Sequence, residues 1–217
     1  LDGTTGAVID SVAGNNGTNN GATRGVTGKI GDAFSFDGIN DYVNIDAALT
    51  PLASTTQGTW SCWVKPTTGT QLGRLITIGD TDANEYLSVN MNAGKLICQA
   101  KDSGDAANRF NASTDAVVFS DGVWAHIALV QNGTSPVLYV NGVLKAITFA
   151  QNNDPTWWIS DGAGLDNMRI GSLNYNSGGD IQFFDGEIDE VALFDTVLTA
   201  AQILELYNSN NGKTYPF

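Results

Sequence analysis

The stretch Val137-Leu-Tyr-Val-Asn-Gly-Val-Leu-Lys-Ala146 places an Asn-Gly pair between two short apolar runs. Both central residues of a type I′ turn need a positive φ, which asparagine and glycine adopt more readily than other residues. We therefore expect the two runs to form a β-hairpin with its turn at Asn141-Gly142. The hairpin predicts an antiparallel sheet in this part of the chain.

Short runs of similar character, bounded by turn residues, fill much of the remaining sequence. They recur about every 8–15 residues, a spacing that favours two antiparallel sheets packed face to face. Asn15–Gly21 is low in complexity and is expected to be a loop. Further strands are expected at residues 33–36, 41–45, 59–65, 74–78, 86–91, 95–100 and 124–130.

One helix is predicted, near the end of the sequence. Thr199 and Gln202 have the spacing of a capping box, and Ile203, Leu206 and Tyr207 form an apolar stripe. The chain has no Gly/Ser- or Pro-rich linker and no internal repeat. We therefore expect a single all-β domain over residues 1–217, with one short C-terminal helix.

The charge balance excludes some partners. The 217 residues carry a net charge of -13 with only ten Lys and Arg residues, and such a surface repels nucleic-acid phosphates and anionic membranes. No apolar run approaches the roughly 18 residues of a membrane-spanning helix. The sequence starts without a charged and apolar leader, so we expect a mature protein or an excised domain.

Cys62 and Cys98 lie in two different predicted strands. They could form one inter-strand disulfide if their Cα atoms lie within about 7 Å. Alternatively, they are two separate buried thiols that pack as small apolar side chains. The sequence leaves both alternatives open.

The stretch Phe183–Phe194 contains two acids on alternating positions, Glu187 and Asp189. Side chains two residues apart on a strand point to the same face, so these carboxylates would line one surface. A third carboxylate at the next alternate position would complete the acid set of a retaining glycosidase. That position holds Val191.

Several segments in order resemble the laminin-G-like jelly-roll domains of the concanavalin A-like lectin/glucanase superfamily. The segments are residues 28–31, 33–43, 60–66, 122–130, 138–143, 168–171, 184–191 and 198–203. The resemblance implies a jelly roll of two curved antiparallel sheets. It also implies a secreted or cell-surface module that binds glycans or proteins and often holds Ca²⁺.

The resemblance also bears on catalysis. The related glucanases need Glu-X-Asp-X-Glu, or the same pattern with one bulged residue inserted. Here the last position is Val191 or Ala192, so the general acid is missing and protonation of the leaving oxygen would fail. We therefore expect no enzyme, and we interpret Asp189 as a structural strut or a metal ligand.

Two acidic clusters are candidate calcium sites, because Ca²⁺ prefers oxygen ligands. The first is Asp37, Asn40 and Asp41 in one turn, which could meet Asp189 from a neighbouring strand. The second is the run from Asp80 through Asp82 and Asn84 to Glu85, whose alternation is similar to the start of an EF-hand loop. The sequence does not decide between them.

Ligand-binding candidates lie in predicted loops. Asn84 matches the asparagine of the calcium-dependent ligand site in pentraxins, which share the jelly roll. Asn174, Tyr175 and Asn176 could bind a sugar, with amides contacting hydroxyls and an aromatic ring stacking on a pyranose. Of the adjacent Trp157 and Trp158, at most one is expected in the core, so the other is a candidate for a ligand.

These observations predict a non-catalytic extracellular binding module that recognises a glycan or a surface ligand and is stabilised by calcium. The alternative is a structural or adhesive domain, such as an adhesin segment or a decoration protein of a cell or virion surface. A divergent glycan hydrolase is the third hypothesis. In each case we expect the chain to be part of a larger protein or assembly.

Overall fold

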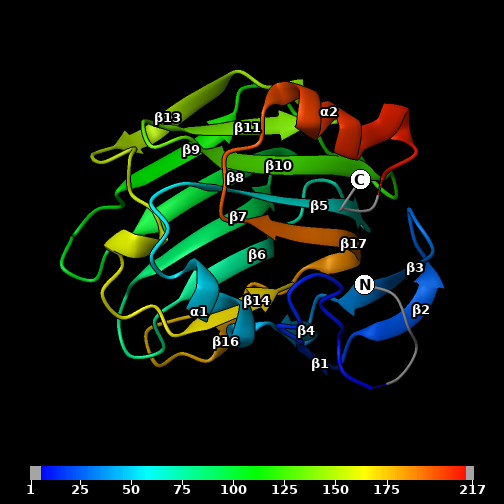
Figure 1. Cartoon of the computed structure of the whole chain (residues 1–217), viewed down its shortest axis with the longest axis horizontal. Coiled ribbons are helices and arrows are strands. Elements are labelled where there is room, and N and C mark those ends of the chain that lie inside the picture. The colour runs from blue at the N-terminus through cyan, green and yellow to red at the C-terminus, as the bar shows by residue number, and fades with distance from the viewer. Residues whose placement is uncertain (1–5, 214–217) are drawn as a thin grey trace.

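The computed structural model describes residues 6–213, whose strands form two large antiparallel sheets (Figure 1). The strands are β1 (Thr18–Asn20), β2 (Thr23–Thr27), β3 (Asp32–Asp37), β4 (Tyr42–Asn44), β5 (Gly58–Pro66), β6 (Gly73–Gly79), β7 (Tyr86–Asn92), β8 (Lys95–Lys101), β9 (Phe110–Thr114), β10 (Ala125–Gln131), β11 (Pro136–Val140), β12 (Val143–Leu144), β13 (Ile147–Asn152), β14 (Asn167–Ile170), β15 (Leu173–Asn174), β16 (Asp180–Ile181) and β17 (Asp185–Phe194).

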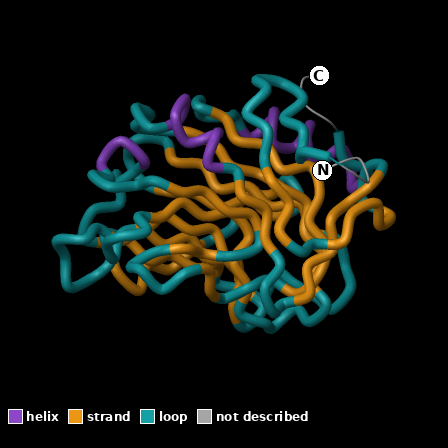
Figure 2. The backbone as a smooth tube through the Cα atoms, turned by 90° about the horizontal axis from the view of Figure 1, so that it is seen from below, coloured by secondary structure: helices purple, strands orange, loops and turns teal. Residues whose placement is uncertain are grey.

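The eight-stranded sheet has the order β1-β4-β14-β6-β7-β8-β9-β13, and the seven-stranded sheet has the order β12-β11-β10-β5-β17-β3-β2. β15 and β16 form a separate pair. Figure 2 shows the strands crossing the middle of the molecule, with loops gathered at their ends. The predicted antiparallel sandwich is confirmed.

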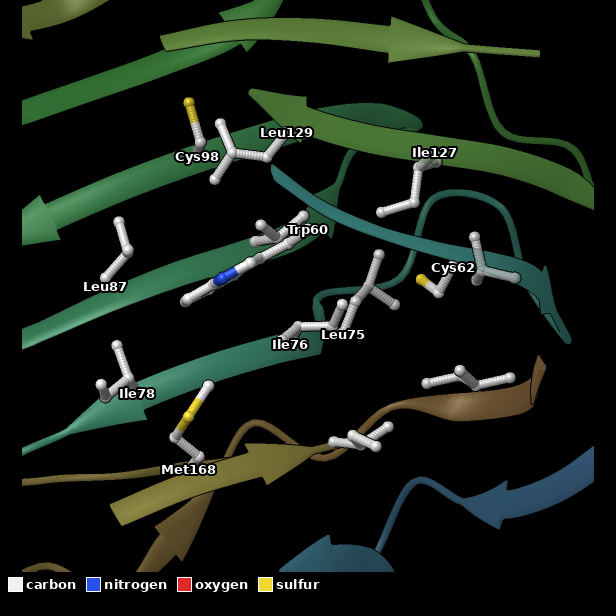
Figure 3. Packing of buried hydrophobic residues seen from close by; sticks show 14 of the residues in the cluster. Trp60, Cys62, Leu75, Ile76, Ile78, Leu87, Cys98, Ile127, Leu129 and Met168 are labelled. Carbon is white, nitrogen blue, oxygen red and sulfur yellow. The ribbon is translucent and has the colours of Figure 1, made fainter. Parts of the chain in front are cut away.

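One cluster of apolar side chains fills the space between the two sheets. Trp60 of β5 and Ile127 of β10 enter it from the seven-stranded sheet, and Leu87 of β7 enters it from the eight-stranded sheet (Figure 3). All three side chains are fully buried. Removal of this apolar surface from water is the main contribution that holds the sheets together.

Cys62 and Cys98 are free thiols buried in the same core. They lie on β5 and β8, which belong to opposite sheets, and Figure 3 shows their side chains well apart. Burial raises the pKa of Cys98 to about 12, and it also raises the pKa of Cys62. Of the two alternatives, the structure has the separate buried thiols.

The Asn-Gly turn has the predicted conformation. Asn141 and Gly142 have φ angles of 53° and 74°, and Val140 of β11 faces Val143 of β12. The expected loop at Asn15–Gly21 is wrong in part, because its residues 18–20 form β1 and pair with β4. These residues are polar because β1 is an edge strand with little contact with the core, and hydrophobic patterns do not reveal such strands.

The C-terminal helix α2 (Ala200–Tyr207) begins at the predicted cap. Thr199 Oγ1 accepts a hydrogen bond from Gln202 N, and Gln202 Oε1 accepts one from Thr199 N. Ile203 and Leu206 pack against Ala128 on the outer face of the seven-stranded sheet. Figure 1 shows α2 beside β10 and β11. The other helical segments are the single turn α1 (Leu49–Leu52) and the 3-10 turns Asp46–Ala48, Ile159–Asp161 and Asn208–Asn210.

His126 of β10 lies on this outer face, beside the stacked rings of Trp63 and Tyr207. Its ring centroid is 5.3 Å from that of Trp63 and 6.4 Å from that of Tyr207. Only 2% of His126 is exposed, and its Nδ1 atom has no hydrogen-bond partner among residues 6–213. Burial lowers the pKa of His126 to about 4, so the imidazole is neutral at pH 7.

This shift predicts a pH-dependent stability. An unfolded histidine has a pKa near 6.5 and binds a proton that the folded protein excludes, so acid favours the unfolded state between pH 6.5 and 4. Between pH 7 and pH 5 we expect His126 alone to lower the free energy of unfolding by about 2 kcal/mol. Urea titrations of the wild type and of His126→Phe at both pH values measure it. An identical pH dependence in the two proteins would contradict the prediction.

Candidate functional site

The two acids that suggested a glycosidase are both engaged in structural contacts on β17. Glu187 forms an ion pair with Lys65 at 3.0 Å. Asp189 is fully buried and accepts hydrogen bonds from the backbone N–H groups of Lys29 (2.8 Å), Ile30 (3.0 Å) and Glu190 (2.8 Å). Asp189 therefore connects β17 to the turn that precedes β3.

A β-bulge follows Asp189. The pairing with β5 shifts between Asp189 and Ala192, and Glu190 adopts a φ of 47° within the bulge. Such a conformation is uncommon for a residue other than glycine. After the bulge, Ala192 packs on the outer face with the side chains beneath α2. The alternative of one inserted residue therefore applies, and the position of the third carboxylate holds an alanine.

The first calcium candidate does not assemble. Asp37 Oδ1 accepts hydrogen bonds from Ile39 N and Asn40 N, and Asp41 Oδ2 accepts one from Asp37 N, so these carboxylates stabilise their own turn. Asp189 is occupied by the three N–H groups described above. Across residues 6–213, no three acidic, histidine or cysteine side chains gather in a way that could hold a metal ion. The prediction that Asp37, Asp41 and Asp189 meet is wrong.

The second calcium candidate lies in the loop between β6 and β7. Asp80 Oδ1 accepts hydrogen bonds from Asp82 N and Ala83 N, whereas Asp82 itself is exposed. Glu85, the last residue of this predicted cluster, is only 1% exposed. Its Oε1 atom accepts a hydrogen bond from Ala163 N at 3.0 Å, but its buried Oε2 atom has no partner among the described residues. Burial raises the pKa of Glu85, and the charges of Asp102 and Asp80 raise it further.

The loop that carries Asn84 meets the loop that carries Asn174, Tyr175 and Asn176. Asn176 N donates hydrogen bonds to Asp80 O (3.0 Å) and Ala83 O (3.1 Å). The ring of Tyr175 packs edge-on against that of Tyr86, with centroids 5.0 Å apart. Asn84 and Asn176 are exposed, whereas Asn174 and Tyr175 are partly buried. The structure thus brings these four candidates to one end of the eight-stranded sheet.

The prediction for Trp157 and Trp158 is wrong. Both side chains are 1% exposed, and both belong to the central core. Trp158 packs against Trp60 with ring centroids 5.3 Å apart. The prediction assumed that adjacent side chains alternate between faces, as they do on a strand. Trp157 and Trp158 instead lead directly into the 3-10 turn Ile159–Asp161, where adjacent side chains can enter the same core.

A polar cluster on the outer face of the eight-stranded sheet was not predicted. Arg74 of β6 lies at its centre, and Nη1 of Arg74 donates hydrogen bonds to Ser88 Oγ (2.7 Å), Asn90 Oδ1 (3.2 Å) and Gln99 Oε1 (3.1 Å). Nε of Arg74 donates to Gln182 Oε1 at 2.7 Å. We call these five residues the Arg74 cluster.

Alternation along β7 and β8 creates this cluster. Leu87, Val89 and Cys98 enter the core, so their neighbours point to the opposite face. Polar residues between core residues were the signal in the sequence that could have revealed the cluster. Gln182 was beyond prediction, because it lies in the short connection between β16 and β17, which only the fold brings to β6.

Arg74 differs from the other arginines on this sheet in its partners. Arg109 forms ion pairs with Asp102 and Asp105, and Arg169 forms them with Asp46 and Asp180. Arg74 is 6% exposed, and within the part of the chain that the structure describes it forms no ion pair. Burial lowers its pKa, as expected for a cation surrounded by neutral groups.

A cavity of about 720 Å³ lies elsewhere, between the segment around residues 8–17 and β17. Two of its charged side chains are already engaged. Asp10 accepts hydrogen bonds from the N–H groups of Val12, Ala13 and Asn15, and Lys213 forms an ion pair with Glu205. We take the Arg74 cluster and the adjoining loops as the candidate site, because Arg74 is a buried cation that forms no ion pair within the described residues.

Comparison with known families agrees with this architecture. The family described as the concanavalin A-like lectin/glucanases superfamily matches residues 37–204. The chain belongs to this superfamily. No curated protein sequence matches the chain. No helix within residues 6–213 is both long and apolar enough to cross a membrane.

Solved structures with the same fold include carbohydrate-binding modules. The CBM40 module of the Ruminococcus gnavus IT-sialidase aligns with a TM-score of 0.68 at 18% identity, covering 83% of this chain and 97% of the module. Domain 4 of the extracellular arabinanase AbnA from Geobacillus stearothermophilus, in complex with arabinotriose, aligns with a TM-score of 0.68 at 22% identity, covering 91% of each chain. At these identities the likeness establishes the fold alone.

The contacts of Asp189 predict its effect on stability. Asp189→Ala leaves three partly buried N–H groups without their acceptor, so we expect the free energy of unfolding to fall by about 3 kcal/mol. Glu187→Gln is the matched control on the same strand, and loss of its partly exposed ion pair should cost less than about 1 kcal/mol. Urea denaturation of the two variants measures both effects. Equal losses would contradict the structural role of Asp189.

Proposed function

We propose that the protein is a non-catalytic, extracellular carbohydrate-binding module whose site is the Arg74 cluster with the adjoining loops. The observation that carries this proposal is the buried arginine, held by amide and hydroxyl side chains beside two tyrosines. Polar groups that are fixed in this way can bind sugar oxygens without further ordering. An aromatic ring such as that of Tyr175 can pack on the apolar face of a pyranose.

The solved structures of similar fold support a sugar as the ligand class. One is the CBM40 module of the Ruminococcus gnavus IT-sialidase bound to α2,3-sialyllactose, and another is the AbnA domain in complex with arabinotriose. The AbnA domain comes from an extracellular arabinanase, which supports the proposed extracellular location. The low identities mean that the site residues themselves carry the proposal.

The contacts of the acidic residues on β17 support a non-catalytic role. Glu187 is neutralised by Lys65, Asp189 accepts three backbone hydrogen bonds, and Ala192 takes the place of a third acid. General acid catalysis needs a carboxyl group that can reach a leaving oxygen. We therefore propose binding without turnover.

A panel of immobilised neutral and acidic glycans tests the proposal. We expect the wild type to bind at least one class, and Tyr175→Ala to weaken that binding about tenfold by loss of a stacking surface. Trp124→Ala, which removes a partly buried aromatic residue next to the seven-stranded sheet, is the matched control and should bind as the wild type does. Absence of binding across the panel would overturn the proposal and favour a protein-interaction role.

We also propose that a structural Ca²⁺ is held in the loop between β6 and β7 by Asp80 and Glu85. Two features support this choice. Glu85 Oε2 is buried without a partner in the described chain, as noted above. Gly162 and Gly164 also bring the backbone of their loop close to the two carboxylates, because a Cβ at residue 164 would collide with Asp80 Oδ2. Carboxylates supplemented by backbone carbonyls are suitable ligands for Ca²⁺.

The calcium proposal predicts a thermal shift. A ligand that binds only the folded state raises its stability, so removing Ca²⁺ with a chelator should lower the Tm by roughly 5–10 °C. In Glu85→Gln, the same chelator should have no effect. If the wild type melts at the same temperature with added Ca²⁺ and with chelator, Glu85 does not bind calcium. A Glu85→Gln variant as stable as the wild type would then indicate that Glu85 is simply protonated.

A further inference from the structure

The hydrogen bonds of Arg74 determine how the amides around it are oriented. A guanidinium group has donors and no acceptor, so each amide that contacts it must present its oxygen. Asn90 Oδ1, Gln99 Oε1 and Gln182 Oε1 all do so. Their NH₂ groups are therefore directed away from Arg74.

The consequence is a cluster whose remaining groups are donors. Nη2 of Arg74 donates to no residue in the described part of the chain, and the NH₂ groups of Asn90, Gln99 and Gln182 have no acceptor there either. None of these nitrogen atoms is both buried and unpartnered, so each has contact with solvent. The Ser88 hydroxyl does not restore an acceptor, because it already accepts from Arg74 and lies 3.4 Å from Asn90 Oδ1.

The charge of Arg74, like the hydrogen-bond donors around it, favours an anionic ligand. Arg74 is a buried cation with four neutral hydrogen-bonding partners, and burial of a charge without a counter-ion is unfavourable. An anionic ligand would supply the missing counter-ion and so reduce the free-energy cost of burying Arg74. A sugar hydroxyl would not, because it carries no charge and itself needs an acceptor.

We propose that the Arg74 cluster binds the carboxylate of an acidic sugar and selects it over neutral sugars of the same shape. A carboxylate has acceptors only, so its two oxygens can accept from the remaining Nη2 donor of Arg74 and from the amide NH₂ groups beside it. This inference rests on the proposed function, because it names the ligand class of the same site. The net charge of -13 means that the protein as a whole repels anions, so the preference for a carboxylate must come from the Arg74 cluster itself.

Matched pairs of sugars test the selection by titration calorimetry. The acids are sialyllactose and trigalacturonate, which carry the carboxylate on different sugar types, and each is compared with its own methyl ester. We expect at least one acid to bind ten times or more tightly than its ester. Which acid binds identifies the sugar type, and lactose and arabinotriose serve as neutral sugars.

Gln99→Glu supplies the missing counter-ion from within the protein. The variant keeps the size of the side chain and its contact with Arg74, so it should fold, and it should lose at least tenfold in affinity for the acid. Gln57→Glu, at an exposed loop position, makes the same charge change away from the cluster and should bind as the wild type does. A single cooperative melting transition in each variant establishes that both are folded.

The outcomes separate the two proposals. If an ester or a neutral sugar binds as tightly as the acid, or if Gln99→Glu binds the acid as the wild type does, the carboxylate inference fails and the module remains a glycan binder. If no sugar of either kind binds, the proposed function falls and the inference falls with it.

Discussion

The pleat of β7 sends Leu87, Val89 and Met91 toward the seven-stranded sheet, and it sends Ser88 and Asn90 to the opposite face. Because successive residues of a strand cannot share a face, the apolar core and the polar cluster are two results of one constraint. Packing of the core fixes the backbone of β7 and β8. The cluster therefore lies on a rigid support.

The outer faces of the two sheets are covered by different kinds of residue. On the seven-stranded sheet, α2 covers apolar residues, and Trp63, His126 and Tyr207 stack beneath it. On the eight-stranded sheet, the loop that leads from β14 to β17 reaches across polar residues and contributes Gln182 to Arg74. The first face thus resembles a second core, whereas the second retains polar groups that are suited to a ligand.

Acidic residues illustrate how a similar sequence pattern leads to different roles. The Asp189 carboxylate accepts hydrogen bonds from three backbone N–H groups and therefore has a structural role. One carboxylate oxygen of Glu85 is buried without a described partner, which makes Glu85 a candidate metal ligand. The two residues differ in the backbone groups that surround their carboxylates, and the spacing of acids in the sequence does not reveal those groups.

Local patterns allowed several elements to be predicted. The hairpin at Asn141-Gly142, the capped helix after Thr199 and most central strands depend on residues close in sequence, so they were correctly anticipated. Predictions that required non-local knowledge were less successful. Asp37, Asp41 and Asp189 do not meet, and Trp157 and Trp158 both enter the core, because packing overrides the alternation expected for a strand.

The sequence by itself determined the all-β class and the antiparallel pairing, because these follow from period-two patterns and turn residues within short windows. It also carried the resemblance to the superfamily, through several short segments in order. Only the tertiary structure decided the site. Residues from β6, β7 and β8 become neighbours through strand pairing, and Gln182 joins them through a loop more than a hundred positions from Arg74. Hydrogen bonding and charge act through space, so their partners are defined only once the chain has folded.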